Sequence, residues 1–95
     1  MMMKGKQMVK LMLSAERVRE ELFTGGFRPM TEQDFYGFAD AEAGSLMADI
    51  SVGRFRYVVI FTPSLGNVQI FDTRIELAST NAWEMDLVSG ETIEL

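Results

Sequence analysis

Residues 46–61 read LMADISVGRFRYVVIF, and this stretch decides the fold. Within residues 46–52, apolar side chains alternate with others, which is typical of a strand with one buried face. Gly53 then turns the chain, and the next strand is expected over residues 54–61. Its segment YVVIF at 57–61 is apolar at every position. A strand that is apolar on both faces indicates a central strand covered on both sides.

The sequence after this central strand predicts further antiparallel strands. Residues 63–67 (PSLGN) are typical of a turn, because proline, serine, glycine and asparagine favour turn geometry. Residues 68–77 predict the next strand, and residues 83–87 (WEMDL) alternate cleanly. Residues 89–90 are suited to close a hairpin onto a last strand at 92–95. The C-terminal half is therefore expected to be an antiparallel meander.

A longer helix is predicted over residues 15–23. Ser14 is suited to cap it, since a serine hydroxyl can accept a hydrogen bond from a free amide of the first turn. Leu13 and Val18 occupy the positions of a hydrophobic staple. Residues 24–26 (TGG) end the helix, because glycine adopts the left-handed conformation at low cost.

A second, short helix is predicted after Thr31. This residue and Asp34 form a variant capping box, in which each side chain can bond the other residue's backbone amide. Gly37 weakens the helix and Gly44 closes the segment. The predicted fold class is α+β: a two-layer domain with a mainly antiparallel sheet of about four to six strands, and one longer and one short helix near the N-terminus.

The segment before the first helix supports two interpretations. Residues 7–13 alternate in a way that predicts a strand, and this is the interpretation we prefer. The apolar positions between residues 8 and 22 also fit a helical stripe, so one longer helix is the alternative. The sequence leaves the choice open.

Composition limits the classes of function. The 95 residues predict a single α+β domain over 1–95, and 47% of them are hydrophobic, as in a globular chain. The chain has no histidine and no cysteine, which removes the commonest general base, the thiolate nucleophile and the usual zinc ligands. We therefore expect no catalytic, cofactor-binding or metal-binding residues, and a protein that is not an enzyme. The absence of cysteine favours the cytoplasm, and no apolar run reaches the ~20 residues of a membrane span.

Charge is unevenly distributed along the chain. Its net charge is −5, but residues 1–30 carry six basic and three acidic residues, whereas residues 31–95 carry three basic and eleven acidic ones. An acidic C-terminal region argues against direct nucleic-acid binding, because phosphate affinity requires positive charge. It permits docking onto a basic surface of a protein partner.

Two groups of residues are candidate partner contacts. The first comprises Tyr36, Asp40 and Glu42, where an aromatic side chain is expected to point out of the short helix among acidic neighbours. The second comprises Glu84 and Asp86, which lie on the strand face opposite Trp83.

The second group has extensions and an alternative. Glu94 is a further candidate for the same acidic face as Glu84. Carboxylates two residues apart on a strand lie about 6.5–7 Å apart, near the phosphate spacing of a DNA strand. Arg54 and Arg56 offer a simpler explanation, since they could pair with these carboxylates across strands.

Three functions follow from these observations. The leading hypothesis is a non-catalytic interaction protein that binds a protein partner or self-associates, since the second face of the central strand needs a cover. The alternative is an acidic inhibitor that imitates nucleic acid and occupies a basic partner. The third is a small ligand-binding protein or hydrolase, which would require a pocket holding a carboxylate with a raised pKa.

Overall fold

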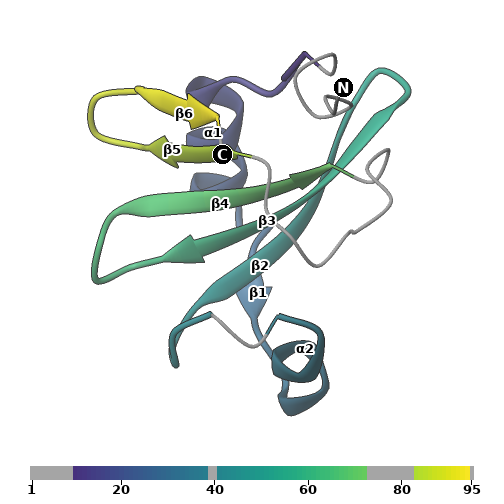
Figure 1. The fold of residues 1–95 in the computed structure, drawn as a ribbon, viewed down its shortest axis with the longest axis vertical. Helices are drawn as coiled ribbons and strands as arrows, with labels where there is room; N and C mark the ends of the chain where they lie inside the picture. The colour runs from purple at the N-terminus through teal and green to yellow at the C-terminus, as the bar shows by residue number, and fades with distance from the viewer. Residues whose placement is uncertain (1–9, 39–40, 73–82, 95) are drawn as a thin grey trace, which may run out of the picture.

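The computed structural model describes residues 10–38, 41–72 and 83–94. All six described strands belong to one antiparallel sheet, in the order in which they occur along the chain (Figure 1). Together with two helices, this makes the protein an α+β fold, as the sequence predicts. The elements are α1 (Ala15–Thr24), β1 (Arg28–Pro29), α2 (Glu32–Gly37), β2 (Leu46–Val52), β3 (Phe55–Thr62), β4 (Asn67–Asp72), β5 (Trp83–Asp86) and β6 (Thr92–Glu94).

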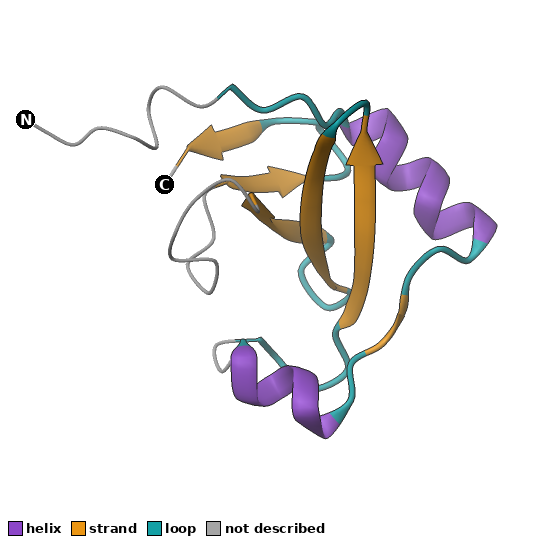
Figure 2. Cartoon of the chain, turned by 90° about the vertical axis from the view of Figure 1, so that its right-hand side faces the viewer, coloured by secondary structure: helices purple, strands orange, loops and turns teal. Residues whose placement is uncertain are grey.

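The α1 side of the sheet holds the larger core. A row of directly paired residues, Ala48, Val59, Ile70 and Trp83, crosses four strands on this face, and all four side chains are buried. Helix α1 covers this face (Figure 2). Its Val18 is fully buried among the strand residues. The residues of this α1-side core are Leu13, Val18, Ala48, Ile50, Tyr57, Val59, Val68, Ile70, Trp83, Met85 and Leu87.

The predicted caps of α1 are confirmed. Ser14 Oγ accepts a hydrogen bond from Arg17 N at 3.2 Å. Gly25 ends the helix with φ of 86°, a left-handed conformation that glycine adopts without a steric penalty. In addition, Arg19 Nη1 donates to Leu87 O at 2.6 Å, which ties the helix to the loop after β5.

The prediction of a strand over residues 7–13 is wrong for residues 10–13, which are the part of this segment that the structure describes. Residues 10–14 form neither a strand nor an extension of the helix, which begins at Ala15, and residues 7–9 lie outside the described residues. The backbone amide of Met12 donates to the Tyr57 hydroxyl at 3.0 Å. Leu11 and Leu13 meanwhile pack against the α1-side core. The alternation therefore reflects an irregular segment held by the Tyr57 hydroxyl, by the buried Leu13 and by the partly buried Leu11.

The α2 side of the sheet holds a smaller core. Met47, Ile60 and Phe71 are buried there, and we call these three residues the α2-side core. The chain around α2 covers them, since Phe38 lies edge-on to Phe71 with ring centroids 4.8 Å apart. The partly buried residues packed against this core are Met30, Phe38, Ala41 and Val58.

The central strand is covered on both faces, as the sequence predicts. Tyr57 and Val59 of β3 belong to the α1-side core, whereas Ile60 belongs to the α2-side core. The cover on the second face comes from this chain's own α2 region. Phe35 of α2 is only half-buried and belongs to neither cluster.

The second helix and the strand boundaries hold with small corrections. The capping box of Thr31 and Asp34 is present, and α2 is short. The strand predicted over residues 68–77 is β4, which the structure shows at Asn67–Asp72. Residues 73–82 lie outside the described residues. Residue 95, the end of the predicted last strand, lies outside them too. The two-residue strand β1 was not predicted, because nothing in its local pattern distinguishes it from a loop.

Candidate interaction surface

The α2 side of the sheet is covered at one end only. One row of paired residues crosses β2 to β6 on this face: Met47, Ile60, Gln69, Glu84 and Ile93. Met47 and Ile60 are buried, Gln69 and Glu84 are half-buried, and Ile93 is 58% exposed. Along this row the cover provided by the α2 region ends between Ile60 and Gln69, although Phe38 still covers Phe71 at the other end of β4. Beyond this point, no other part of the described chain covers the face over the start of β4 and over β5 and β6.

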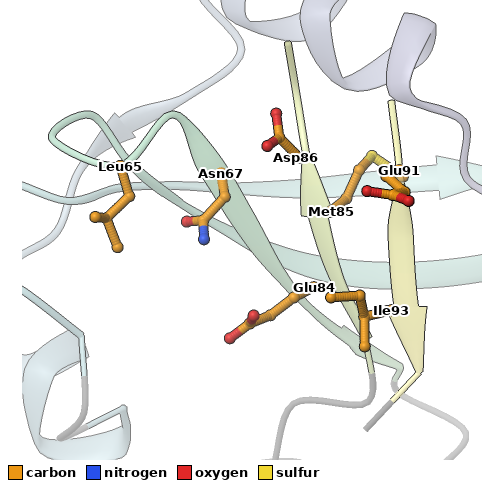
Figure 3. A pocket seen from close by; sticks show the side chains of 7 residues that line it. All are labelled: Leu65, Asn67, Glu84, Met85, Asp86, Glu91 and Ile93. Atoms are coloured by element: carbon orange, nitrogen blue, oxygen red, sulfur yellow. The ribbon is translucent and has the colours of Figure 1, made fainter. Parts of the chain in front are cut away.

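A hollow of about 170 Å³ lies on this part of the sheet. In Figure 3, Leu65 in the turn before β4 and Asn67 at the start of β4 point to the same side as the Glu84 side chain. Ile93 of β6 lies next to Glu84. Asp86 and Glu91 lie at the hairpin end of the same strands. The hollow is lined by Leu65, Asn67, Glu84, Met85, Asp86, Glu91 and Ile93. Except for Met85, which belongs to the α1-side core, we call these residues the open face.

The open face combines acidic groups with exposed apolar groups. Leu65 is 65% exposed, and it lies with Ile93 beside three carboxylates, those of Glu84, Asp86 and Glu91. The ion pairs formed between described residues lie elsewhere, on α1 and at the start of α2. Among residues 10–38, 41–72 and 83–94, these three carboxylates thus have no basic side chain in salt-bridge contact.

Asp86 has a structural role as well. Its Oδ1 accepts hydrogen bonds from the amides of Val88 at 2.8 Å and Ser89 at 3.2 Å, which fixes the loop that joins β5 to β6. Gly90, with φ of 82°, donates its amide to Asp86 O at 2.7 Å, and this closes the turn. Among the described residues, the Glu84 carboxylate accepts no such hydrogen bond, so it is the better candidate for a partner contact.

The suggested pairing of Arg54 and Arg56 with the β5 carboxylates is wrong. Strand β4 lies between β3 and β5, so Arg56 faces Ser51 of β2 rather than any residue of β5. Glu94 was also expected on the face of Glu84, but it pairs with Trp83 and therefore belongs to the α1 side. The register explains both errors, since a strand's neighbours cannot be read from its own alternation.

The other predicted contact residues lie around α2. Tyr36 points outward and is 75% exposed. Glu42 Oε1 accepts a hydrogen bond from Ser64 Oγ at 2.9 Å, and Ser64 directly precedes Leu65 of the open face. Asp40 lies outside the described residues. The structure thus places Glu42 next to the turn that borders the open face, while Tyr36 stays a separate prediction.

Among the described residues, the clearest shift of a pKa is that of Asp34, in the capping box of α2. Arg28 Nη1 lies 2.7 Å from Asp34 Oδ2. This hydrogen bond, together with that from the Thr31 amide, holds the pKa of Asp34 well below its usual range. It also raises the pKa of Arg28. The pair fastens β1 to the start of α2 and takes no part in the open face.

Sequence reasoning missed the apolar half of the open face. Leu65 was assigned to a turn, and Ile93 to a hairpin strand without a stated exposure. The adjacency of Glu84 and Ile93 depends on the hairpin register, which the four-residue loop after Asp86 determines. The local signal for that loop was the glycine at position 90.

The described residues contain no group of three or more acidic residues placed to hold a metal ion. In the same part of the chain, neither helix has the length and hydrophobicity needed to cross a membrane. Comparison with known families found no matching family model, and no similar protein was found among curated proteins or solved structures.

Proposed function

We propose that this protein is a non-catalytic interaction protein of the cytoplasm that binds a basic segment of a partner protein on its open face. The observation that supports the proposal is the paired row across the α2 side, which changes from buried Met47 and Ile60 to exposed Ile93 beside Glu84. An exposed apolar patch rimmed by polar residues is a mark of an interaction site, and the exposed Leu65 and Ile93 lie in such a setting.

The chemistry of the open face favours lysine and arginine side chains. Their aliphatic stems can pack on Leu65 and Ile93, while their charged groups reach the Glu84 carboxylate. The net charge of −5 would attract such a partner and accelerate its encounter with the protein. The sequence suggested self-association because the second face of the central strand needed a cover. The α2 region of the same chain provides that cover, so binding of a basic partner is better supported than a homodimer.

Peptide binding tests this proposal. The probe is a fluorescently labelled seven-residue peptide that alternates lysine and valine, and its control carries glutamate in place of lysine. Fluorescence anisotropy should show binding of the basic peptide only. Glu84→Gln should weaken binding about fivefold, which corresponds to about 1 kcal/mol for a partly buried ion pair.

The matched control is Glu20→Gln, which changes the net charge equally on the exposed surface of α1. It should leave the dissociation constant within experimental error. Equal weakening by the two variants would show that only net charge attracts the peptide. Equal affinity for the basic and acidic peptides would contradict the proposal outright.

Imitation of nucleic acid is the second candidate function. Glu84 and Asp86 share one face of β5, about 6.5–7 Å apart as next-but-one neighbours on a strand. The double variant Glu84→Lys, Asp86→Asn would then prevent the protein from displacing an oligonucleotide from a basic nucleic-acid-binding protein. Displacement that persists with this variant would exclude the imitation of nucleic acid through β5.

A further inference from the structure

Strand β6 forms one edge of the sheet. It is the last strand in the sheet order, and it pairs with β5 on its inner side (Figure 1). Its three residues, Thr92, Ile93 and Glu94, are all exposed. Within the described residues no strand pairs with its outer side. An unpaired edge offers backbone donors and acceptors to a strand of another chain.

The hydrogen bonds of the hairpin show which β6 groups face that edge. Asp86 N donates to Glu91 O at 2.8 Å, so these two residues form a hydrogen-bonded pair. Hydrogen-bonded and non-hydrogen-bonded pairs alternate in an antiparallel ladder. The pair Glu84–Ile93 is therefore hydrogen-bonded inward, whereas Thr92 and Glu94 direct their amides and carbonyls outward.

A bond on the other side of β5 supports the same assignment. Leu87 N donates to Gly66 O at 3.1 Å, on the β4 side. By the same alternation, odd-numbered residues of β5 bond β4, and even-numbered residues bond β6. Both observations indicate that the amide and carbonyl groups of Thr92 and Glu94 point to the outer edge of β6.

We infer that the partner's basic segment binds as an extended strand along the outer edge of β6, which adds a seventh strand to the sheet. This inference rests on the proposed function and specifies its binding mode. The added strand would pair with the outward groups of Thr92 and Glu94. Strand addition of this kind gives affinity through the backbone and selectivity through alternate side chains.

Charge on both faces of the edge selects a basic strand. Glu91, directly before β6, and Ile93 lie on the open face, and Glu94 lies on the opposite face of β6. An added strand with lysine or arginine would bring cations beside Glu91 and Glu94, and long side chains could pass over Ile93 towards Glu84. A second copy of this chain would instead bring its own Glu91 and Glu94 to the same edge, which like-charge repulsion disfavours.

Backbone methylation separates strand addition from simple charge attraction. The lysine–valine peptide is compared with the same peptide N-methylated at every internal amide, which keeps the charges and removes the donors. The methylated peptide should bind about 30-fold more weakly, which corresponds to two lost hydrogen bonds of about 1 kcal/mol each. Equal affinity of the two peptides would overturn strand addition and leave binding on the open face intact.

Amide hydrogen exchange of the full chain locates the contact. With the basic peptide bound, the amides of Thr92 and Glu94 should exchange at least tenfold more slowly, while those of the exposed residues Glu16 and Glu20 on α1 keep their rates. Protection of residues around Leu65 without protection of Thr92 and Glu94 would also overturn the inference.

Two further outcomes are distinguished in the same samples. Protection of Thr92 and Glu94 that increases with protein concentration, without peptide, would assign the edge to a second copy and contradict a basic partner. If the basic peptide fails to bind and Glu84→Gln has no effect, the proposed function fails together with this inference.

Discussion

Replacing Val18 by alanine tests the packing of α1 on the sheet. Val18 is fully buried in the α1-side core, so the change removes two methyl groups from a packed site. Loss of burial costs about 1.6 kcal/mol at about 0.8 kcal/mol per group, and the residual cavity adds to this. Alanine has a higher helix propensity than valine, which offsets about 0.5 kcal/mol of this loss of stability. We expect the free energy of unfolding to fall by about 1.5–2.5 kcal/mol.

The matched control is Val88→Ala, the same chemical change at a side chain that is 90% exposed. It should change the free energy of unfolding by less than about 0.5 kcal/mol. Trp83 reports unfolding in both variants, because it is the only tryptophan in the chain and lies buried in the α1-side core.

Urea unfolding followed by tryptophan fluorescence measures both variants. With a slope of about 1–2 kcal/mol per molar urea, the midpoint of Val18→Ala should fall by about 1–2 M. The midpoint of Val88→Ala should stay close to that of the unmodified protein. Equal midpoints for the two variants would refute the packing of α1 against the sheet described above.

Two other predictions concern the α2 region. Phe38→Ala removes the ring that packs on Phe71 and should lower the free energy of unfolding by about 2 kcal/mol, whereas Tyr36→Ala, at an exposed neighbour, should change it little, as urea unfolding will show. The bond from Arg28 lowers the pKa of Asp34 in the folded state, so its stabilising effect is full above the unfolded pKa of about 3.9 and is lost progressively as the pH falls from there through the lower folded-state pKa. Asp34→Asn should therefore lower the melting temperature more at pH 6 than at pH 3, with the loss still declining towards pH 2, and an equal loss at all three pH values would contradict this linkage.

Local signals in the sequence predict the caps and most of the strands. Ser14, Thr31 and Gly25 act on backbone groups within four residues, so each can be recognised without knowledge of the fold. The alternation of residues 46–52 likewise reports a buried face directly. The α+β class follows from these local elements and their order.

The features that the sequence does not predict depend on distant partners. Met12 bonds the hydroxyl of Tyr57, which lies 45 residues further along the chain, and no local pattern indicates this bond. The boundary of the open face depends on where Phe38 meets Phe71. Glu84 could be chosen as a contact from its strand alone, but its neighbour Ile93 could only be found from the register.

The two edges of the sheet differ in a way that limits the size of any assembly. At the far edge, β1 has two residues, and Pro29 lacks the amide proton that a pairing strand would need. A strand that joins β6 therefore uses a different edge from the one that β1 partly covers. If two copies joined through β6, each would use that same edge and the pair would be closed. The expected complexes are finite in stoichiometry, and strand addition at β6 provides no route to a growing fibre.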